Sequence, residues 1–393
     1  MAQVLLDLFY SFGNCLNCFP GNPNLKINNR SFKILRLLGE GGFSYVYLVE
    51  DTNTHELFAL KKIRCPFGAE SVQQAMREVD AYRLFSHVPT IISASDHAVA
   101  TERGADETTK TVYVLLPYYK RGNLQDMINA NLVNHDRFPE RRLMLLFLGV
   151  CKALRAMHEY RPAVERMEIG REEDQHHDTR GKRTEEEEEG EQERGLLEGE
   201  SQVNGGRSIQ HYAHRDIKPG NIMIDDTGST PILMDLGSVA PSPTPVTSQS
   251  LALQIQDTAA EHSTMPYRAP ELFDVQTGTV IDTKVDIWSL GCTLYACLVG
   301  KSPFEMRSDE TGGTLSMCVL GGDWRFPDEG PAGVKRNMRP QQQQQQAPAI
   351  EISEPIREVV RKCLNVEPAE RPDIGELIDM VQTVIEELPN DAN

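Results

Sequence analysis

The chain has 393 residues, a formal net charge of −18, 39% hydrophobic residues and 25% charged residues. These values exclude a fully disordered chain, because the apolar residues suffice for a large buried core. The acidic balance argues against nucleic acid as a partner, since nucleic-acid binding depends on positive surface charge. Eight scattered cysteines favour a reducing compartment over a disulfide framework.

A small β-rich lobe with one helix is predicted after an apolar appendage over residues 1–31. Alternating apolar residues indicate strands, and a helical period indicates the helix. The expected elements are two strands around a glycine turn over 32–48, a strand over 57–63, a helix over 72–85 and a strand over 113–117. Polar and glycine residues then favour a linker at 117–122.

A larger lobe is expected after this linker, around an apolar segment at 141–160 that is typical of a buried helix. Residues 161–210 are too poor in apolar residues to fold alone and predict a disordered insertion, and residues 323–349 predict a low-complexity insertion. The first contains Glu185–Glu189 and the second contains Gln341–Gln346. The acidic insertion is either a docking or regulatory tail or an inert solvated loop, and we favour the inert loop.

The strongest chemical signal is the sequence His-Arg-Asp-Ile-Lys-Pro-Gly-Asn at 214–221, followed by an apolar strand and by Asp235-Leu236-Gly237. A bare His-Arg-Asp could be an ordinary surface turn, but the whole pattern resembles the catalytic and metal-binding loops of protein kinases. Lysine at position 218 is typical of serine/threonine kinases. The resemblance implies that Asp216 is the catalytic base, that Lys218 contacts the γ-phosphate, and that Asn221 and Asp235 hold Mg²⁺.

A glycine-rich segment upstream resembles the loop that covers ATP in these enzymes. Missing side chains let backbone amides approach phosphates, although a glycine hairpin alone is often only a tight turn. The segment precedes Phe58-Ala59-Leu60-Lys61, which resembles the strand lysine that contacts the α- and β-phosphates. The resemblance therefore implies ATP binding by Gly39, Glu40, Gly41, Gly42, Phe43, Ser44, Val46, Ala59 and Lys61.

The strand lysine needs an acidic partner on the next helix. Glu78 lies where kinases place that glutamate, and Glu70 is the competing candidate. We expect an ion pair between Lys61 and Glu78. The resemblance further places Leu116 at the gatekeeper position and sets the backbone carbonyl of Pro117 and amide of Tyr119 against adenine.

The sequence Tyr-Arg-Ala-Pro-Glu at 267–271 resembles the end of a kinase activation segment. The resemblance implies that the hydroxyl of Thr264 bridges the catalytic base and the lysine. It also implies that Glu271 and Arg371 form a buried ion pair and that Asp286 holds the backbone of the catalytic loop. Together with the segments above, this motif resembles the Numb-associated kinases, and that resemblance implies an unusual helix in the activation segment, which we expect over 247–262, and constitutive activity.

These segments together resemble the Numb-associated kinase family, and within it the branch of serine/threonine-protein kinase 16, whose fungal relatives act at vacuolar membranes. Leu236 departs from the phenylalanine that most kinases have there. The resemblance implies an α+β, two-lobed protein kinase fold with a small β-rich N-lobe and a larger, mostly helical C-lobe. The expected boundaries are an N-lobe at 32–116, a hinge at 117–122, a C-lobe at 123–388 and a tail at 389–393.

The appendage is expected to be a lipid anchor. No stretch of about 18 apolar residues predicts a membrane span, and residue 2 is alanine, which excludes myristoylation. Cys15 and Cys18 lie beside an apolar run, as palmitoylation requires. A zinc or redox site and unmodified thiols are the alternatives. With acylation, we expect a cytoplasmic protein on the surface of endomembranes, at the vacuole or the Golgi.

The expected function is transfer of phosphate from ATP, with Mg²⁺, to serine or threonine of proteins, including the chain itself, in membrane trafficking or in vacuole or Golgi function. A pseudokinase scaffold that binds ATP at membranes is the first alternative, and a kinase of small metabolites is the second. The first conflicts with the presence of Lys61, Asp216, Asn221 and Asp235. The second conflicts with the activation-segment motif.

Overall fold

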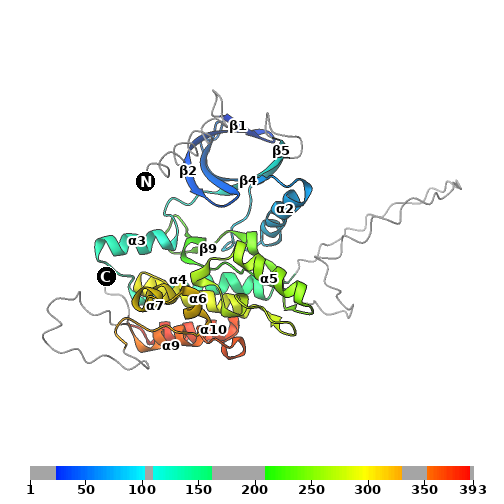
Figure 1. Ribbon diagram of the computed structural model, residues 1–393. Coiled ribbons are helices and arrows are strands. Elements are labelled where there is room, and N and C mark those ends of the chain that lie inside the picture. Colours follow the sequence, from blue (N-terminus) through cyan, green and yellow to red (C-terminus); the bar gives the residue numbers. More distant parts are fainter. Residues whose placement is uncertain (1–23, 102–108, 162–208, 330–351, 390–393) are drawn as a thin grey trace, which may run out of the picture.

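Strands form the upper lobe in Figure 1, and helices form most of the lower lobe. The computed structural model describes residues 24–101, 109–161, 209–329 and 352–389. Within these residues the α+β architecture with two lobes, a small one of strands and a larger one of helices, is confirmed.

The upper lobe is one antiparallel sheet with the strand order β1-β2-β3-β4-β6-β5. Asn28, between β1 and β2, donates from Nδ2 to Oδ1 of Asp96 at 2.7 Å and to the carbonyl oxygen of His97 at 3.2 Å. These bonds join the two edge strands, so the sheet curls into the barrel-like shape seen in Figure 1. The strands are β1 (Asn24–Ile27), β2 (Arg30–Glu40), β3 (Ser44–Asp51), β4 (Leu57–Cys65), β5 (Asp96–Thr101) and β6 (Lys110–Pro117).

Side chains of β6 enter two separate cores, because successive residues of a strand point to opposite faces. Tyr113 and Leu115 help to fill the interior of the curled sheet. Val112, Val114 and Leu116 face the other way and belong to the large core of the lower lobe. The strand is therefore apolar on both faces, and its side chains pack into both cores.

Helix α2 (Ala69–Leu84) lies between the sheet and the lower lobe. Its buried residues include Ala75, Glu78, Val79 and Tyr82, which share one helical face by their spacing. A glutamate is rarely buried without a partner, since an unpaired charge in an apolar environment is costly. Glu78 therefore requires a cationic partner close to this face of the helix.

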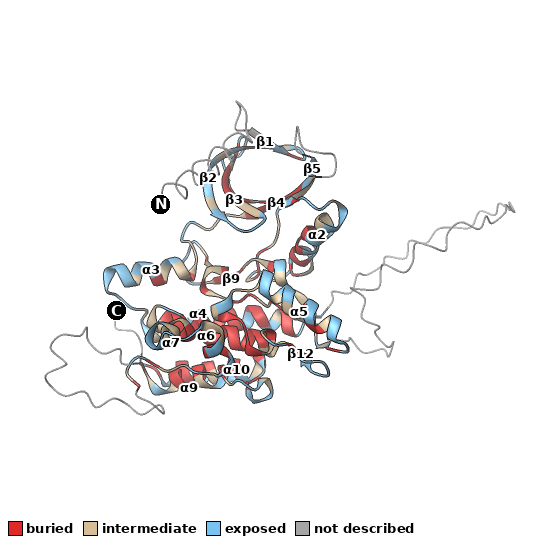
Figure 2. Cartoon of the chain, in the orientation of Figure 1, coloured by how far each residue is buried: buried red, intermediate tan, exposed pale blue. Residues whose placement is uncertain are grey.

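The lower lobe is built around α4 and α6, whose residues are largely buried in Figure 2. Short strands and turns above them carry the loops that meet the upper lobe. In chain order its elements are α3 (Leu124–Asn134), α4 (Glu140–His158), β7 (His211–Ala213), η1 (Pro219–Asn221), β8 (Ile222–Ile224), β9 (Pro231–Leu233), η2 (Leu236–Ser238), β10 (Ala240–Ser242), β11 (Thr244–Pro245), α5 (Gln249–His262), η3 (Met265–Tyr267), η4 (Pro270–Leu272), β12 (Val280–Ile281), α6 (Lys284–Val299), α7 (Pro303–Thr311), α8 (Leu315–Leu320), α9 (Glu354–Cys363), η6 (Pro368–Glu370) and α10 (Ile374–Glu387).

The helix expected over 247–262 is present as α5 and is confirmed. Its first turn is capped by Ser248, whose hydroxyl oxygen accepts from the amide of Leu251 at 3.2 Å. Ala252 and Ile255 are buried against the lower lobe. The helix is therefore a packed part of the lobe.

Two expected boundaries are wrong. The upper lobe does not begin at residue 32, because β1 pairs with β2 from Asn24 onward, so residues 24–31 belong to the sheet and not to an appendage. The insertion expected over 323–349 does not begin at 323 either. Phe326 is fully buried and stacks on Tyr295 with ring centroids 5.2 Å apart, so residues 323–329 are part of the fold.

Several other predictions lie outside the described residues. These are the acidic insertion except for its ends, the glutamine tract, the tail after Pro389, and the proposed acylation sites Cys15 and Cys18. The ends of the acidic insertion are described. Tyr160 and Gln210 form an isolated antiparallel bridge, and the amide of Gln210 donates to the carbonyl of Tyr160 at 2.9 Å.

Candidate active site

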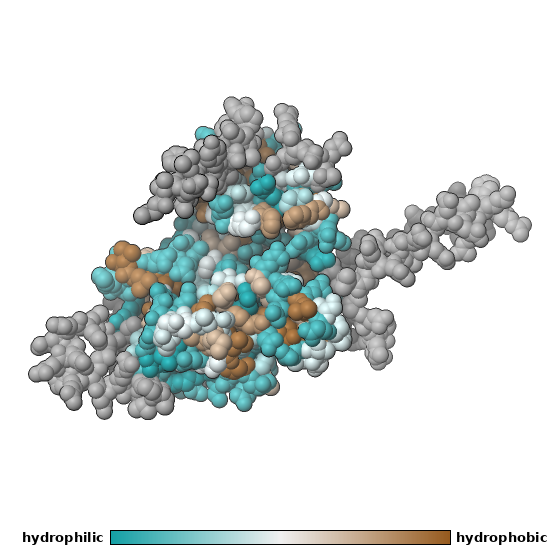
Figure 3. Space-filling model, in the orientation of Figure 1, coloured by the Kyte–Doolittle hydropathy of each residue, from teal (hydrophilic) through white to brown (hydrophobic). Residues whose placement is uncertain are grey.

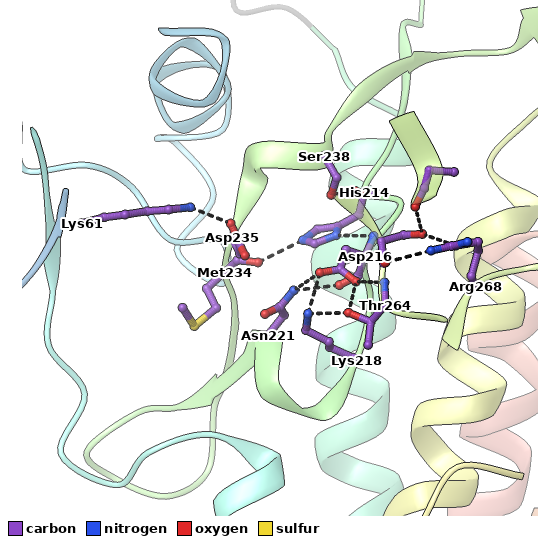
Figure 4. A network of polar contacts seen from close by, with 12 residues as sticks. Lys61, His214, Asp216, Lys218, Asn221, Met234, Asp235, Ser238, Thr264 and Arg268 are labelled. Carbon is purple, nitrogen blue, oxygen red and sulfur yellow. Dashed lines mark hydrogen bonds and ion pairs between the residues drawn. The ribbon is translucent and has the colours of Figure 1, made fainter. Parts of the chain in front are cut away.

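Asp216 lies at the centre of a network of polar side chains between β7 and β8 (Figure 4). Its Oδ1 accepts from the backbone amide of Thr264 at 2.9 Å and from the hydroxyl of Thr264 at 2.8 Å. Its Oδ2 accepts from Nζ of Lys218 at 2.8 Å, and the same Nζ lies 2.6 Å from Oγ1 of Thr264. Asp216, Lys218 and Thr264 thus form the three-way contact that the resemblance implied.

Asn221 and Asp235 bring oxygen atoms to one side of this network. Nδ2 of Asn221 donates to Oδ2 and to the carbonyl of Asp216, both at 2.9 Å, which leaves the side-chain oxygen of Asn221 to serve a cation. The amide of Met234 donates to the carbonyl of Asn221 at 3.0 Å and ties the two loops together. Carboxylate and amide oxygens suit Mg²⁺, which usually takes one or two such ligands together with phosphates. The donor set therefore fits magnesium.

Lys61 on β4 reaches across to this side of the site. Its Nζ lies 2.7 Å from Oε1 of Glu78 and 2.9 Å from Oδ1 of Asp235. The ion pair that the resemblance to kinases implied is present, whereas Glu70, the competing candidate, is exposed at the start of α2. Tyr82 donates its hydroxyl to the same Oε1 of Glu78 at 2.6 Å.

Charge pairing sets the protonation of this group. Burial opposes the charged form of Lys61, but the attraction of Glu78 and Asp235 outweighs burial and raises its pKa. The Lys61 ammonium in turn lowers the pKa of Asp235 to about 2. Lys61 and Asp235 are therefore both ionised at neutral pH, as contacts to phosphate and metal require.

The catalytic loop is held from below by Asp286 at the start of α6. Its two carboxylate oxygens accept from the backbone amides of His214 and Arg215, each at 2.7 Å, and Oδ2 lies 2.9 Å from Nε2 of His158. Burial opposes ionisation of Asp286, but these bonds and nearby charges lower its pKa overall. An ionised carboxylate with three donors fixes the loop that carries Asp216.

The glycine-rich segment joins β2 to β3. Gly39 and Glu40 end β2, Gly41, Gly42 and Phe43 form the turn, and Ser44 begins β3, with the Gly41 amide donating to the Ser44 carbonyl at 2.7 Å. A Cβ atom at Gly39 or Gly42 would meet no protein atom within 4 Å. Packing within the described protein therefore does not require glycine there, which favours close approach of a ligand.

Strand register brings the remaining nucleotide-site candidates together. Val46 lies opposite Lys61 in the β3–β4 pair, and Ala59 lies opposite Leu116 in the β4–β6 pair. Leu116 is buried, and Pro117 ends β6.

Tyr119 lies in the link from β6 to α3. The amide of the next residue, Lys120, donates to Oδ1 of Asp226 at 3.1 Å, and Gly122 turns the chain with a φ of 75°. Tyr119 and Gly122 thus lie in the segment that joins the two lobes.

Glu271 and Arg371 form the second expected ion pair. Nη1 and Nη2 of Arg371 lie 2.7 and 2.8 Å from the two carboxylate oxygens of Glu271. The guanidinium also stacks over the ring of Trp288, with 5.0 Å to the centroid. The Arg371 side chain is fully buried, and the pair ties η4 to the residue that follows η6 in the lower lobe.

Three residues of the site were not predicted from the sequence. Tyr82 fixes Glu78 and lies one helical turn after it, a spacing that could have been noticed. His158 binds Asp286 from α4, and no sequence signal joins two residues so far apart. Arg268 was quoted only within a motif, but its Nε donates to Oγ of Ser263 at 2.7 Å beside the threonine that binds Asp216.

Comparisons with known proteins agree with this geometry. The family model of the protein kinase domain matches residues 32–163 and 209–381. Serine/threonine-protein kinase ENV7 of Saccharomyces cerevisiae is 32% identical over 396 residues, covering 97% of this chain and 99% of the relative. Serine/threonine-protein kinase ppk13 of Schizosaccharomyces pombe is 32% identical over 374 residues, with 93% of each chain covered. Human serine/threonine-protein kinase 16 is 30% identical over 367 residues, covering 93% of this chain and 94% of the relative.

Proposed function

Since the chain belongs to the protein kinase family and is a serine/threonine protein kinase, we propose that Asp216, Lys218, Asn221, Lys61 and Asp235 perform its reaction with Mg²⁺ and ATP. The observation that carries this proposal is the contact of Asp216 with a hydroxyl, since Oγ1 of Thr264 already donates to Oδ1 at 2.8 Å. A carboxylate that accepts from a fixed hydroxyl is placed to accept from the hydroxyl of a protein substrate.

Each of these residues has a task that its contacts support. ATP supplies the phosphoryl group, and Mg²⁺ neutralises the phosphate charge when both are bound. Asp216 orients the attacking hydroxyl and accepts its proton, while Lys218 offsets the negative charge that gathers at the transferred group. Asn221 and Asp235 hold the metal through oxygen atoms. Lys61, fixed by Glu78, holds the phosphates nearest the adenosine.

The proposed roles are tested by transfer of labelled phosphate to the chain itself and to a generic basic protein. We expect activity in the wild type and a loss of about a hundredfold or more in Asp216→Asn and in Asp235→Asn. Asp257→Asn on α5 is the matched control, because this carboxylate is exposed, and it should retain full activity. Nucleotide binding by Asp216→Asn, measured separately, should persist.

Two results would contradict the proposal. Activity that survives in Asp216→Asn would remove Asp216 from the reaction. A wild type that binds ATP but transfers phosphate to no hydroxyl would support an ATP-binding scaffold instead. Transfer to the chain itself also tests autophosphorylation.

Attachment to the cytoplasmic surface of endomembranes, at the vacuole or the Golgi, is a second part of the proposal. Within the described residues no helix is long and apolar enough to cross a membrane. On the face shown in Figure 3, exposed apolar side chains form small separate patches among hydrophilic ones. Cys15 and Cys18, beside the apolar run of residues 4–12, are therefore the features that support attachment, through two acyl chains or one chain with the apolar run.

Acylation is tested with Cys15→Ser/Cys18→Ser in cells. We expect the wild type in the membrane fraction, release by hydroxylamine, which cleaves thioesters, and the double variant in the soluble fraction. Cys65→Ser serves as control, because this buried cysteine lies outside the appendage. An unchanged distribution of the double variant would contradict acylation as the anchor and with it the role in membrane trafficking.

A further inference from the structure

The end of α5 contacts both lobes through three successive residues, His262, Ser263 and Thr264. Thr264 binds Asp216 through its amide and its hydroxyl. Ser263 accepts from Nε of Arg268 at 2.7 Å through its hydroxyl and from Nη2 of Arg268 at 3.2 Å through its carbonyl. Nε2 of His262 lies 2.9 Å from Nε2 of Gln74 on α2. One tripeptide therefore links the catalytic base to the helix of the upper lobe.

Gln74 is close in the fold to the nucleotide side of the site. It lies four residues before Glu78 on α2, so the two side chains follow one another along the same side of the helix. Glu78 holds Lys61 at 2.7 Å. A restraint on Gln74 thus acts within one helical turn of the ion pair that positions the lysine.

Helix α5 is a fixed support for this contact. Ile255 is buried, and Oε1 of Gln256 accepts from the amide of Val275 at 3.3 Å, so the helix is attached to the lower lobe along its length. Arg268, which holds the end of the helix, is buried and stacks over the ring of Phe273 at 4.9 Å. The position of His262 follows from the fold and requires no modified residue.

The contact is exposed, and Nε2 of His262 also lies 3.7 Å from a carboxylate oxygen of Glu261. Imidazole Nε2 can accept from the amide nitrogen of Gln74, or donate to its oxygen when the amide is turned and the other tautomer is present. A glutamine at position 262 would carry its own Nε2 where the imidazole has one, whereas an asparagine is too short and mimics only Nδ1. The contact can therefore be removed and restored by choice of side chain.

We propose that His262 is a positioning residue that, through Gln74, holds α2 and the Lys61–Glu78 ion pair in place over the catalytic loop. This inference rests on the proposed function of Lys61 in nucleotide binding. It gives the activation segment a direct contact with the small lobe that is made by unmodified side chains.

The test compares the full-length wild type with His262→Ala, Gln74→Ala and the double variant. The measured quantities are the KM for ATP, the KM for the protein substrate, kcat, and the Kd of a fluorescent ATP analogue in the absence of transfer. For either single variant we expect the KM for ATP and the Kd to rise about threefold to tenfold, as for loss of one hydrogen bond. The KM for the protein substrate and the melting temperature should stay unchanged, and the double variant should be no worse than the singles.

Matched variants separate positioning from general damage. Gln73→Ala and Gln254→Ala change exposed residues of the same two helices and should have no effect. His262→Gln should restore wild-type nucleotide affinity, and His262→Asn should not. Unchanged affinity in both single variants, multiplied effects in the double variant, or equal rescue by asparagine would each overturn the inference. A wild type without transferase activity would overturn the proposed function alone, because the Kd still reports on the contact.

Discussion

Asp216 and Glu271 are both carboxylates held by cationic side chains, but their surroundings differ in one respect. Glu271 is matched by Arg371, and every N–H of that guanidinium is used, on the two oxygens of Glu271 and on the carbonyls of Asn365, Lys284 and Val366. Asp216 is held instead by the separate donors of a lysine, an asparagine and a threonine. The Glu271–Arg371 network uses every hydrogen-bond donor of its guanidinium, so it stabilises the fold. The donors around Asp216 come from separate side chains, so a substrate hydroxyl can replace one of them.

The largest expected effect on stability follows from removing Arg371. Arg371→Ala removes a fully buried guanidinium and leaves the partly buried Glu271 without its partner, and we expect the free energy of unfolding to fall by about 3–5 kcal/mol in denaturant titrations. Arg83→Ala, which breaks an exposed pair with Asp80, should cost about 1 kcal/mol or less. Asp216→Asn should leave the free energy of unfolding close to that of the wild type. A small effect of Arg371→Ala would mean that the lower lobe relaxes around the loss.

Substitutions at two glycines, Gly291 and Gly42, should separate an effect on stability from an effect on ATP binding, with changes of intermediate size. A Cβ atom at Gly291 in α6 would lie 2.6 Å from Cβ of Cys363, so Gly291→Ala should reduce the free energy of unfolding by about 1–3 kcal/mol. A Cβ atom at Gly42 would meet nothing within 4 Å. Gly42→Ala should leave stability unchanged and weaken ATP binding. Thermal unfolding with nucleotide titration distinguishes the two, and the reverse pattern would reject the assignment of the glycine-rich segment.

The smallest expected effect is on how the free energy of unfolding depends on pH below about 4. Lys61 lowers the pKa of Asp235 to about 2 in the folded state, whereas an unfolded aspartate titrates near about 4. The stability that this pair contributes is present above about pH 4 and is lost as the pH falls toward 2. In Asp235→Asn, the free energy of unfolding should therefore change less between pH 4 and 2 than in the wild type. Parallel curves for the two proteins would contradict the lowered pKa.

The sequence predicted much of the site because the chemistry depends on residue types at short, fixed spacings. The loop at 214–221 and the interval from Lys61 to Glu78 were recognised because they resemble protein kinase motifs, and helix α5 was expected from the resemblance to the Numb-associated kinases. Strand β1 was not, because four residues carry little signal, and they form a strand only by pairing with β2. Contacts such as His158 with Asp286 depend on the tertiary fold, so no local pattern could reveal them.

The bridge between Tyr160 and Gln210 has a consequence for how this chain can vary. Tyr160 is buried and packs edge to face against Phe85 and Tyr212, with ring centroids 5.5 and 5.7 Å apart, so the two ends of the insertion are fixed beside each other. The described chain therefore stops at residue 161 and resumes at residue 209 at neighbouring positions, just before the strand that leads to the loop carrying Asp216. Sequence can be added or removed there without moving Asp216, which makes this point a natural place to splice in a reporter domain.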